Sequence, residues 1–493
     1  MTCLVARFIM PPYSPDSLPM GDEINSRYFD AEHFSGFRER LDDESHLLRQ
    51  YFADDSFSTR GDMAGFELEA WLVDGAGNPA PRNEDFLRQL NDPLVVHELA
   101  AFNVELNGSP SSLNGRVFSR LYDELHSTWE RCRNAARVLD LQLASIGILP
   151  TITEKLLCSE YMSSMVRYRS LNDRVLALRD GKPFSLDIEG DSDLSLKHRD
   201  VMLEAAATSF QIHLQCRPGH AVRDFNASLV ASAPMVAASA NSPFLFGHSL
   251  WDETRIPLFE QAVDTGERYP PRVSFGHDYL HESMLEVFER NQQDHPILLP
   301  ALQDTPTHQF HHVRFHNGTL WRWNRPLIGF DFDGRAHLRI EHRVVPAGPT
   351  IRVCIANAAF YFGLVYGLRT WKEPVDTLLP FDKARDNFYT AARYGLNARI
   401  LWADENGEAE RSVRELILHD LLPVARLGLE SREIPKSEID EYLGIIADRV
   451  ETSQNGAAWQ RRWVGMHGPD LNDLTLNYLR CQETGEPVHT WEL

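Results

Sequence analysis

The chain has 493 residues, of which 43% are hydrophobic and 24% are charged, with 29 glycines and 28 prolines. This composition is typical of a globular protein and excludes disordered, collagenous and coiled-coil proteins. With 49 basic and 71 acidic side chains the net charge is −22, so the surface repels phosphate backbones and anionic lipids, and we expect neither a nucleic-acid nor a membrane partner. No stretch reaches the roughly 20 apolar residues that a membrane helix needs.

The N-terminal segment lacks the sustained apolar core of a signal peptide, because its short apolar run ends at Pro11 and Pro12. We predict a flexible leader over residues 1–20. The six cysteines are scattered and contain no CxxC pair, which excludes a standard zinc ribbon and favours a cytoplasmic protein without a disulfide framework. The oligomeric state stays open, with a homo-oligomer among the options.

Helical and strand periodicities alternate along the chain. Apolar residues at helical spacing predict helices at 28–52, 116–143, 410–430 and 437–451. Alternation of polar and apolar residues predicts strands at 65–73, 103–107, 208–215, 319–325 and 337–345. After about residue 370 we expect no further strands. The pattern indicates an α+β catalytic body over 21–370 and a helical C-terminal part over 371–493 that packs on it.

The segment GFELEAWLVD places two glutamates on one face of the first predicted strand. Alternate residues of a strand face opposite sides, so Phe66 and Leu68 point to a core while Glu67 and Glu69 lie side by side. Neighbouring carboxylates repel each other, and a divalent cation that prefers hard oxygen ligands relieves the repulsion. The alternative is a pair of solvated glutamates on an exposed strand face.

The other predicted strands repeat this alternation. The polar positions of FNVELNG, SFQIHLQ and HLRIEHRVV include Glu105, Gln211, His213, Arg339, Glu341 and Arg343. Solvated strand faces usually carry lysine, threonine and serine in mixture, whereas these faces carry no lysine and offer metal ligands and anion-binding groups. We therefore expect a single polar cup on one antiparallel sheet.

Carboxylates that bind metals, together with arginines in an acidic protein, are typical of phosphoryl transfer from ATP. Neither a P-loop motif nor G-x-G-x-x-G occurs in the chain, so P-loop and Rossmann folds are not supported. ATP would then be held by Mg²⁺ or Mn²⁺ ions that bridge its phosphates and by a few arginines.

In the order and spacing of its motifs the sequence resembles glutamate–cysteine ligase family 2, the bacterial carboxylate–amine ligases, which are distant relatives of glutamine synthetase. The resemblance covers roughly 60–465 and rests on GFELEAWLVD, ELAAFNVELNGSP, SFQIHLQ, NSPFLFG, ETRIPLFEQ, WRWNRP followed by RIEHRVVPAGPT, AARYGLNARI and GAAWQRR. It implies a curved antiparallel sheet, a funnel like that of glutamine synthetase covered by helices, which ATP enters at one end and an amino acid at the other.

The resemblance also implies roles for individual residues. Arg343 would be the catalytic arginine on the transferring phosphoryl group, and Arg325 would contact an ATP phosphate or a substrate carboxylate. The implied metal ligands are Glu67, Glu69, Glu98, Glu105, His213 and Glu341. Further candidates for ATP or substrate contacts are Arg339, Arg255 and Gln211. For Arg255 a structural ion pair is the alternative.

The expected activity is an ATP- and magnesium-dependent ligase acting on small molecules. A carboxylate, most simply the γ-carboxylate of L-glutamate, would attack ATP, and an amine such as cysteine would capture the acyl phosphate. The products would be an amide, ADP and phosphate, as in glutathione biosynthesis.

Three alternatives remain open. A zinc hydrolase could use a histidine set, His308, His311, His312 and His316, with His277 and His281 four residues apart on one helical turn. A non-catalytic, regulatory relative could retain the fold. A metal-dependent kinase could use the same sheet.

Overall fold

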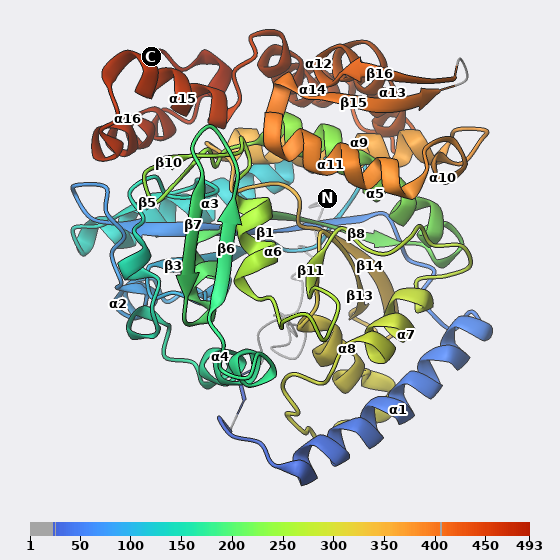
Figure 1. Cartoon of the computed structure of the whole chain (residues 1–493). Helices are drawn as coiled ribbons and strands as arrows, with labels where there is room; N and C mark the ends of the chain where they lie inside the picture. The colour runs from blue at the N-terminus through green and yellow to red at the C-terminus, as the bar shows by residue number, and fades with distance from the viewer. Residues whose placement is uncertain (1–22, 25, 405–406) are drawn as a thin grey trace, which may run out of the picture.

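The computed structural model describes residues 23–24, 26–404 and 407–493 (Figure 1), so the leader predicted at 1–20 lies outside the described residues. The helices are α1 (Ala31–Ala53), α2 (Asn83–Leu90), α3 (Val117–Val138), α4 (Val166–Leu178), α5 (Ala221–Ser239), α6 (Arg255–Ala262), α7 (Leu285–Asp294), α8 (His311–Gly318), α9 (Ile351–Arg369), α10 (Val375–Leu378), α11 (Phe381–Tyr394), α12 (Val413–Leu416), α13 (Leu422–Glu430), α14 (Lys436–Glu451), α15 (Gly456–His467) and α16 (Leu471–Glu483).

The strands are β1 (Met63–Val73), β2 (Val95–His97), β3 (Asn103–Asn107), β4 (Ser111–Ser112), β5 (Gln142–Ala144), β6 (Phe184–Ile188), β7 (Leu194–His198), β8 (Phe210–Cys216), β9 (Phe244–Leu245), β10 (His248–Ser249), β11 (Val273–Ser274), β12 (Trp321–Arg322), β13 (Asn324–Phe330), β14 (Ala336–His342), β15 (Arg399–Asp404) and β16 (Gly407–Ser412).

One eight-stranded sheet organises the molecule. Its order is β13-β14-β8-β1-β3-β2, with β4 and β5 paired to β1 as well. Every pairing in this sheet is antiparallel. The predicted α+β class with a curved antiparallel sheet and C-terminal helices is confirmed. The strands predicted at 65–73, 103–107, 208–215 and 337–345 correspond to β1, β3, β8 and β14.

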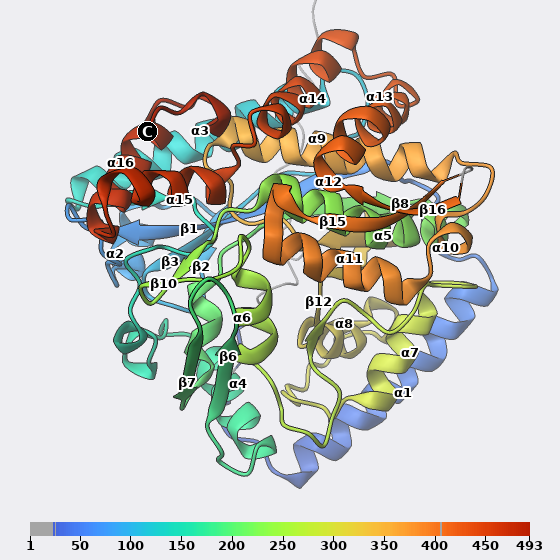
Figure 2. The same cartoon turned by 45° about the horizontal axis from the view of Figure 1, so that its top comes forward.

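The apolar face of the sheet packs against long buried helices. In β1 the side chains of Phe66 and Leu68 are 3% and 0% exposed. Helices α5 and α9 pack on β8, β13 and β14 and are almost entirely buried and largely apolar. Figures 1 and 2 show α5, α9 and α11 on one side of the sheet and α1, α4, α7 and α8 on the other. The strand alternation therefore directs the polar residues away from the α5–α9 layer.

Helix α9 is long and apolar enough to cross a membrane, but 94% of its most apolar window is buried inside the protein. It contacts α3, α5, α13 and α14. Close approach of α13 depends on glycines, since a Cβ on Gly428 would lie 2.1 Å from the carbonyl oxygen of Gly363 in α9. This helix is thus the centre of the helical layer, and the C-terminal helices pack directly on it.

Four sequence predictions are wrong in detail. The expected absence of strands after 370 fails because β15 and β16 form a hairpin, whose second strand is short, charged and largely exposed and so carries no apolar alternation. The helix predicted over 116–143 ends at Val138, and 142–144 join the sheet as β5. The strand predicted over 319–325 divides into β12 and β13.

The helix predicted over 410–430 is interrupted. Its first residues belong to β16, and α12 and α13 flank a π-helical turn at Ile417–Leu421. Pro423 stands in the first turn of α13, where it cannot donate a backbone hydrogen bond to the preceding turn. The division of the chain at residue 370 into body and C-terminal part stays a prediction.

Candidate active site

The strand registers bring the predicted polar residues into adjacent rows. On β1, Glu69 lies opposite Glu105 of β3, and Glu67 lies opposite Gln211 of β8. On the other side of β8, His213 lies opposite Glu341 of β14. Since side chains on neighbouring antiparallel strands share a face at paired positions, four strands contribute to one polar surface.

A first cluster consists of Glu67, His213 and Glu341, whose ligand atoms lie within 4.8 Å of one another. The His213 Nε2 atom lies 3.4 Å from Glu67 Oε1 and 3.9 Å from Glu341 Oε1. Burial by itself raises the pKa of Glu67, but the neighbouring His213 and the charge of Arg339 together outweigh burial, so the pKa of Glu67 is lowered. Two carboxylates and one imidazole facing one point suit a divalent cation.

A second cluster consists of Glu69, Glu98 and Glu105, again with ligand atoms within 4.8 Å of one another. Burial and then the charge of Glu98 raise the pKa of Glu69 to about 7. Burial and the charges of the neighbouring glutamates raise the pKa of Glu105 well above its ordinary value. For Glu69, the charges of Arg343 and Arg255 offset this rise only in part. Three crowded carboxylates resist ionisation until a cation neutralises them, so this cluster also has the donor set of a metal site.

The position of Glu98 explains how it meets Glu105, although the two residues are seven positions apart in the sequence. Glu98 follows β2, and the chain turns before β3 begins at Asn103. The side chain of Ser163 donates a hydrogen bond to the Glu98 carbonyl oxygen, and Asn83 Nδ2 donates to Ser163 Oγ at 2.9 Å. The turn between the two strands therefore returns Glu98 to the face that carries Glu105.

Arg343 and Gln211 connect the two clusters. Arg343 Nη1 lies 3.2 Å from Glu341 Oε2 and also donates to Gln211 Oε1. Gln211 Nε2 donates to Glu69 Oε1 at 2.8 Å, and the backbone N–H of Ser209 donates to Glu69 Oε2 at 2.7 Å. These bonds hold Glu69 and Arg343 in fixed positions, with the Arg343 side chain 11% exposed.

Arg325 forms a two-point ion pair with Glu341, with Nε–Oε2 at 2.7 Å and Nη2–Oε1 at 3.0 Å. Arg255 pairs with Glu253 at 3.1 Å and donates to the carbonyl oxygens of Arg343 and Val344. Arg255 thus forms the structural ion pair expected as the alternative to a substrate contact. Substrate contacts for Arg325 and Arg255 stay predictions.

Arg339 lies apart from this group. It faces Gln215 of β8 and Leu327 of β13, and its charge helps to lower the pKa of Glu67 after the larger effects of burial and His213. It does not line the cavity described next.

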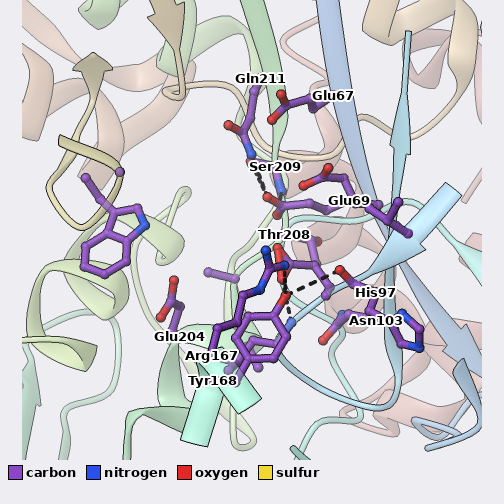
Figure 3. Close-up of a pocket in the computed structure, with 18 of the residues that line it drawn as sticks. Glu67, Glu69, His97, Asn103, Arg167, Tyr168, Glu204, Thr208, Ser209 and Gln211 are labelled. Atoms are coloured by element: carbon purple, nitrogen blue, oxygen red, sulfur yellow. Dashed lines mark hydrogen bonds between the residues drawn. The ribbon is translucent and has the colours of Figure 1, made fainter. Parts of the chain in front are cut away.

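Glu67 of the first cluster and all three residues of the second cluster line one cavity of about 560 Å³, shown in Figure 3, whereas His213 and Glu341 do not line it. Glu67, Glu69, Glu98 and Glu105 line it, as do the predicted contacts Gln211, Arg255, Arg325 and Arg343. The structure thus brings most of the predicted site residues together at one cavity. Which of them bind metal, ATP or substrate stays a prediction.

Sequence reasoning missed several cavity residues, among them Arg167 and Tyr168 of α4 and Glu204 of the 3₁₀ turn Val201–Ala206. Arg167 Nη2 donates to the Tyr168 hydroxyl at 2.7 Å. Adjacent positions of a helix and a single turn carry no periodic or motif signal, so these residues become visible only when α4 and the turn pack over the sheet.

The histidine set does not assemble. The segment from His277 to His281 is not helical, so the predicted pairing on one helical turn is wrong. The buried His312 contacts Glu44 at 2.7 Å through Nδ1, and His316 Nε2 bonds the Asn291 carbonyl oxygen at 3.1 Å. In the described parts of the chain, the groups of three or more residues able to hold a metal are the two glutamate clusters alone.

Comparison with solved structures identifies the class of fold. Glutamate–cysteine ligase from Francisella tularensis, solved in complex with AMP, is 12% identical with a TM-score of 0.50, covering 89% of this chain and 91% of that chain. A bifunctional glutathione synthetase from Pasteurella multocida is 10% identical with a TM-score of 0.50, covering 89% of this chain and 55% of that chain. The protein therefore has the fold of these ligases.

The family follows from the sequence. The model of glutamate–cysteine ligase family 2 matches residues 63–477, and the chain belongs to this family of ATP-dependent carboxylate–amine ligases. The resemblance drawn from the motifs is confirmed. A comparison with curated protein sequences finds no match.

Proposed function

We propose that the protein is an ATP- and Mg²⁺- or Mn²⁺-dependent ligase that joins the γ-carboxylate of L-glutamate to an amine, with cysteine as the first candidate. The carboxylate attacks the γ-phosphate of ATP and forms an acyl phosphate, which the amine converts into an amide with release of phosphate. With cysteine the product would serve glutathione biosynthesis.

The observation that carries this proposal is one cavity lined by Glu67 of the first cluster, by the whole second cluster and by Arg343. Phosphoryl transfer needs positioned positive charge around the transferring group more than it needs covalent chemistry. In a chain of net charge −22, that positive charge has to come from bound cations and a few buried arginines.

The residues of the clusters fit divalent cations, because they offer carboxylate oxygens and one imidazole nitrogen. Glu67, His213 and Glu341 would hold one ion, and Glu69, Glu98 and Glu105 would hold another. When bound, such ions neutralise phosphate charge and act as Lewis acids.

Side chains with fixed orientations would stabilise the transferring phosphoryl group beside the metal ions. Arg343, tied to Glu341 and Gln211, keeps its charge because Glu341 and Glu69 outweigh the effect of burial and raise its pKa. A guanidinium held in this way stabilises charge that develops on phosphate oxygens without reorganising. The partly apolar cavity limits hydrolysis of the acyl phosphate by excluding water.

The test is a screen for ADP release with Mg-ATP across pairs of amino acids and amines, with mass spectrometry of the products. An amide product that depends on both acid and amine supports the proposal. A phosphorylated acid or amine without an amide would identify a kinase instead. No ADP release for any pair, together with no binding of Mg-ATP by calorimetry, would leave a regulatory relative.

We also propose a cytoplasmic location and small-molecule substrates as the partners. The acidic surface supports both, because it disfavours nucleic acid and anionic membranes.

A further inference from the structure

The cavity contains one acidic group that the proposed metal sites do not use. Among the described residues that line it, Glu204 is the only carboxylate outside the two clusters. It lies in the 3₁₀ turn Val201–Ala206, which comes shortly before β8. Ala205, Ala207 and Thr208 from the same segment also line the cavity, so the turn forms part of its wall.

The carboxylate of Glu204 lacks a partner. Its Oε2 atom is fully buried and accepts no hydrogen bond within the described residues. An unpaired buried carboxylate oxygen is costly, and its natural complement is a cationic hydrogen-bond donor that enters the cavity. Figure 3 labels Glu204 and Arg167 among the residues that line the cavity, and α4 packs on the turn. No ion pair between these two residues occurs in the described structure, so Glu204 remains available.

The position of Glu204 suits the second half of the reaction. The charges of Glu98, Arg343 and Glu69 all act on its carboxyl group, which lies in the same cavity as these residues. A group that binds there lies beside the second carboxylate cluster and the arginine assigned to the phosphoryl group, where the acyl phosphate would form.

We propose that Glu204 binds the ammonium group of the amine substrate and accepts its proton. The inference rests on the proposed ligase function and assigns a residue to its amine. Amino groups of amino acids and alkyl amines have a pKa of about 8 to 10 and are largely protonated near neutral pH, and the ammonium form has no lone pair with which to attack.

The step balances as follows. One proton passes from the ammonium group to the Glu204 carboxylate. The nitrogen lone pair then forms the C–N bond at the carbonyl carbon of the acyl phosphate, and the bond from that carbon to the phosphate oxygen breaks with its electron pair on phosphate. The departing phosphate takes up the second nitrogen proton, and Glu204 returns its own proton to water.

The proton affinity of Glu204 supports this role. Burial and then the charge of Glu98 raise its pKa to about 8. A general base works best when its pKa lies near the working pH, and an ordinary glutamate would be too weak to take a proton from an amine.

The test compares two nucleophiles in Glu204→Gln with Mg-ATP and L-glutamate. L-cysteine arrives as an ammonium ion, whereas hydroxylamine is uncharged near neutral pH and captures an acyl phosphate as a hydroxamate. We expect amide formation with L-cysteine to fall by about 100-fold or more, while hydroxamate formation stays within about threefold of the wild type. Glu204→Asp should recover part of the amide formation, and Glu160→Gln, a change at an exposed residue, should alter neither product.

Equal loss of hydroxamate and amide in Glu204→Gln would overturn the inference and indicate a structural role. Retention of both would overturn it as well. These outcomes differ from failure of the proposed function, in which the wild-type protein forms neither product and releases no ADP. Calorimetry of L-cysteine binding without ATP gives a readout independent of turnover, and we expect binding to weaken at least tenfold in Glu204→Gln.

Discussion

Arg325 donates hydrogen bonds to both carboxylate oxygens of Glu341 across the β13–β14 pair, with Nε–Oε2 at 2.7 Å and Nη2–Oε1 at 3.0 Å. Both side chains are almost fully buried, at 1% and 0% exposed. Arg343 reaches the same carboxylate at 3.2 Å. Burial alone raises the pKa of Glu341, but these two guanidinium groups outweigh it and hold that pKa far below its ordinary value. Glu341 is therefore an anion at every working pH.

Loss of Arg325 should be strongly destabilising. In Arg325→Met we expect the free energy of unfolding to fall by about 3–5 kcal/mol, because a buried carboxylate loses its main countercharge. Urea unfolding followed by circular dichroism measures the change. The matched control is Arg82→Met, since Arg82 pairs with Asp85 at an exposed position, where a loss below about 1 kcal/mol is expected. Equal changes in the two variants would contradict the prediction.

Glu67→Ala and Arg343→Ala should each abolish ADP release that depends on acid and amine, by about 100-fold or more. Glu67 belongs to the first cluster, and Arg343 connects both clusters. A coupled assay of ADP measures activity, and circular dichroism checks that each variant keeps the fold. Unchanged ADP release in both variants would refute the assigned roles.

Metal binding should depend on pH through the second cluster. Because the pKa of Glu69 is raised to about 7 and that of Glu105 is raised well above its ordinary value, protons compete with the cation for these carboxylates. Below pH 7 we expect the affinity for Mn²⁺ to rise with pH, by up to about tenfold per pH unit for each proton that metal binding releases. Calorimetry measures this affinity. Glu105→Gln should flatten this dependence, and an unaltered slope would count against the second site.

The same pKa shifts set the stability of the metal-free protein. The pKa of Glu69 is higher in the folded protein than in the unfolded chain, so the folded protein binds more protons. The free energy of unfolding therefore falls as the pH rises through about 7 and Glu69 loses its proton. We expect a lower melting temperature at pH 8 than at pH 6 without metal, and a smaller difference with saturating Mg²⁺. A metal-free melting temperature that rises over this range would contradict this expectation.

Two helical glycines should respond oppositely to alanine. In Gly428→Ala the new Cβ meets the backbone of Gly363 and Gly367 in α9, so we expect a loss of about 2 kcal/mol or more as the helices separate. In Gly444→Ala of α14 the Cβ meets nothing within 4 Å, and the better helix propensity should stabilise by about 0.5–1 kcal/mol. Thermal unfolding of both variants tests whether α13 packs on α9 this closely.

The strands and their faces could be predicted from sequence. The alternation in GFELEAWLVD assigns Glu67 and Glu69 to the polar face, and the observed β1 retains that arrangement with Phe66 and Leu68 buried. A period of two is a local property of the backbone, so a single sequence suffices to read it. The short hairpin β15–β16 escaped prediction because its exposed strand carries no apolar period.

The tertiary structure decided how the polar residues are grouped. Residue types alone present six candidate ligands as one set, whereas the registers divide them into two clusters of three.

The roles of the arginines also depend on register. Pairing of β13 with β14 places Arg325 opposite Glu341, where it forms a two-point ion pair, while its contact with phosphate or substrate stays a prediction.

Glu204 and Arg167 enter the cavity only because α4 and a 3₁₀ turn pack over the sheet. Strand alternation is a local property that the sequence determines by itself. Register and the packing of distant segments are non-local, because they depend on which contacts the whole chain can satisfy together. For that reason the sequence determined the class of chemistry, and the fold decided which residues meet to perform it.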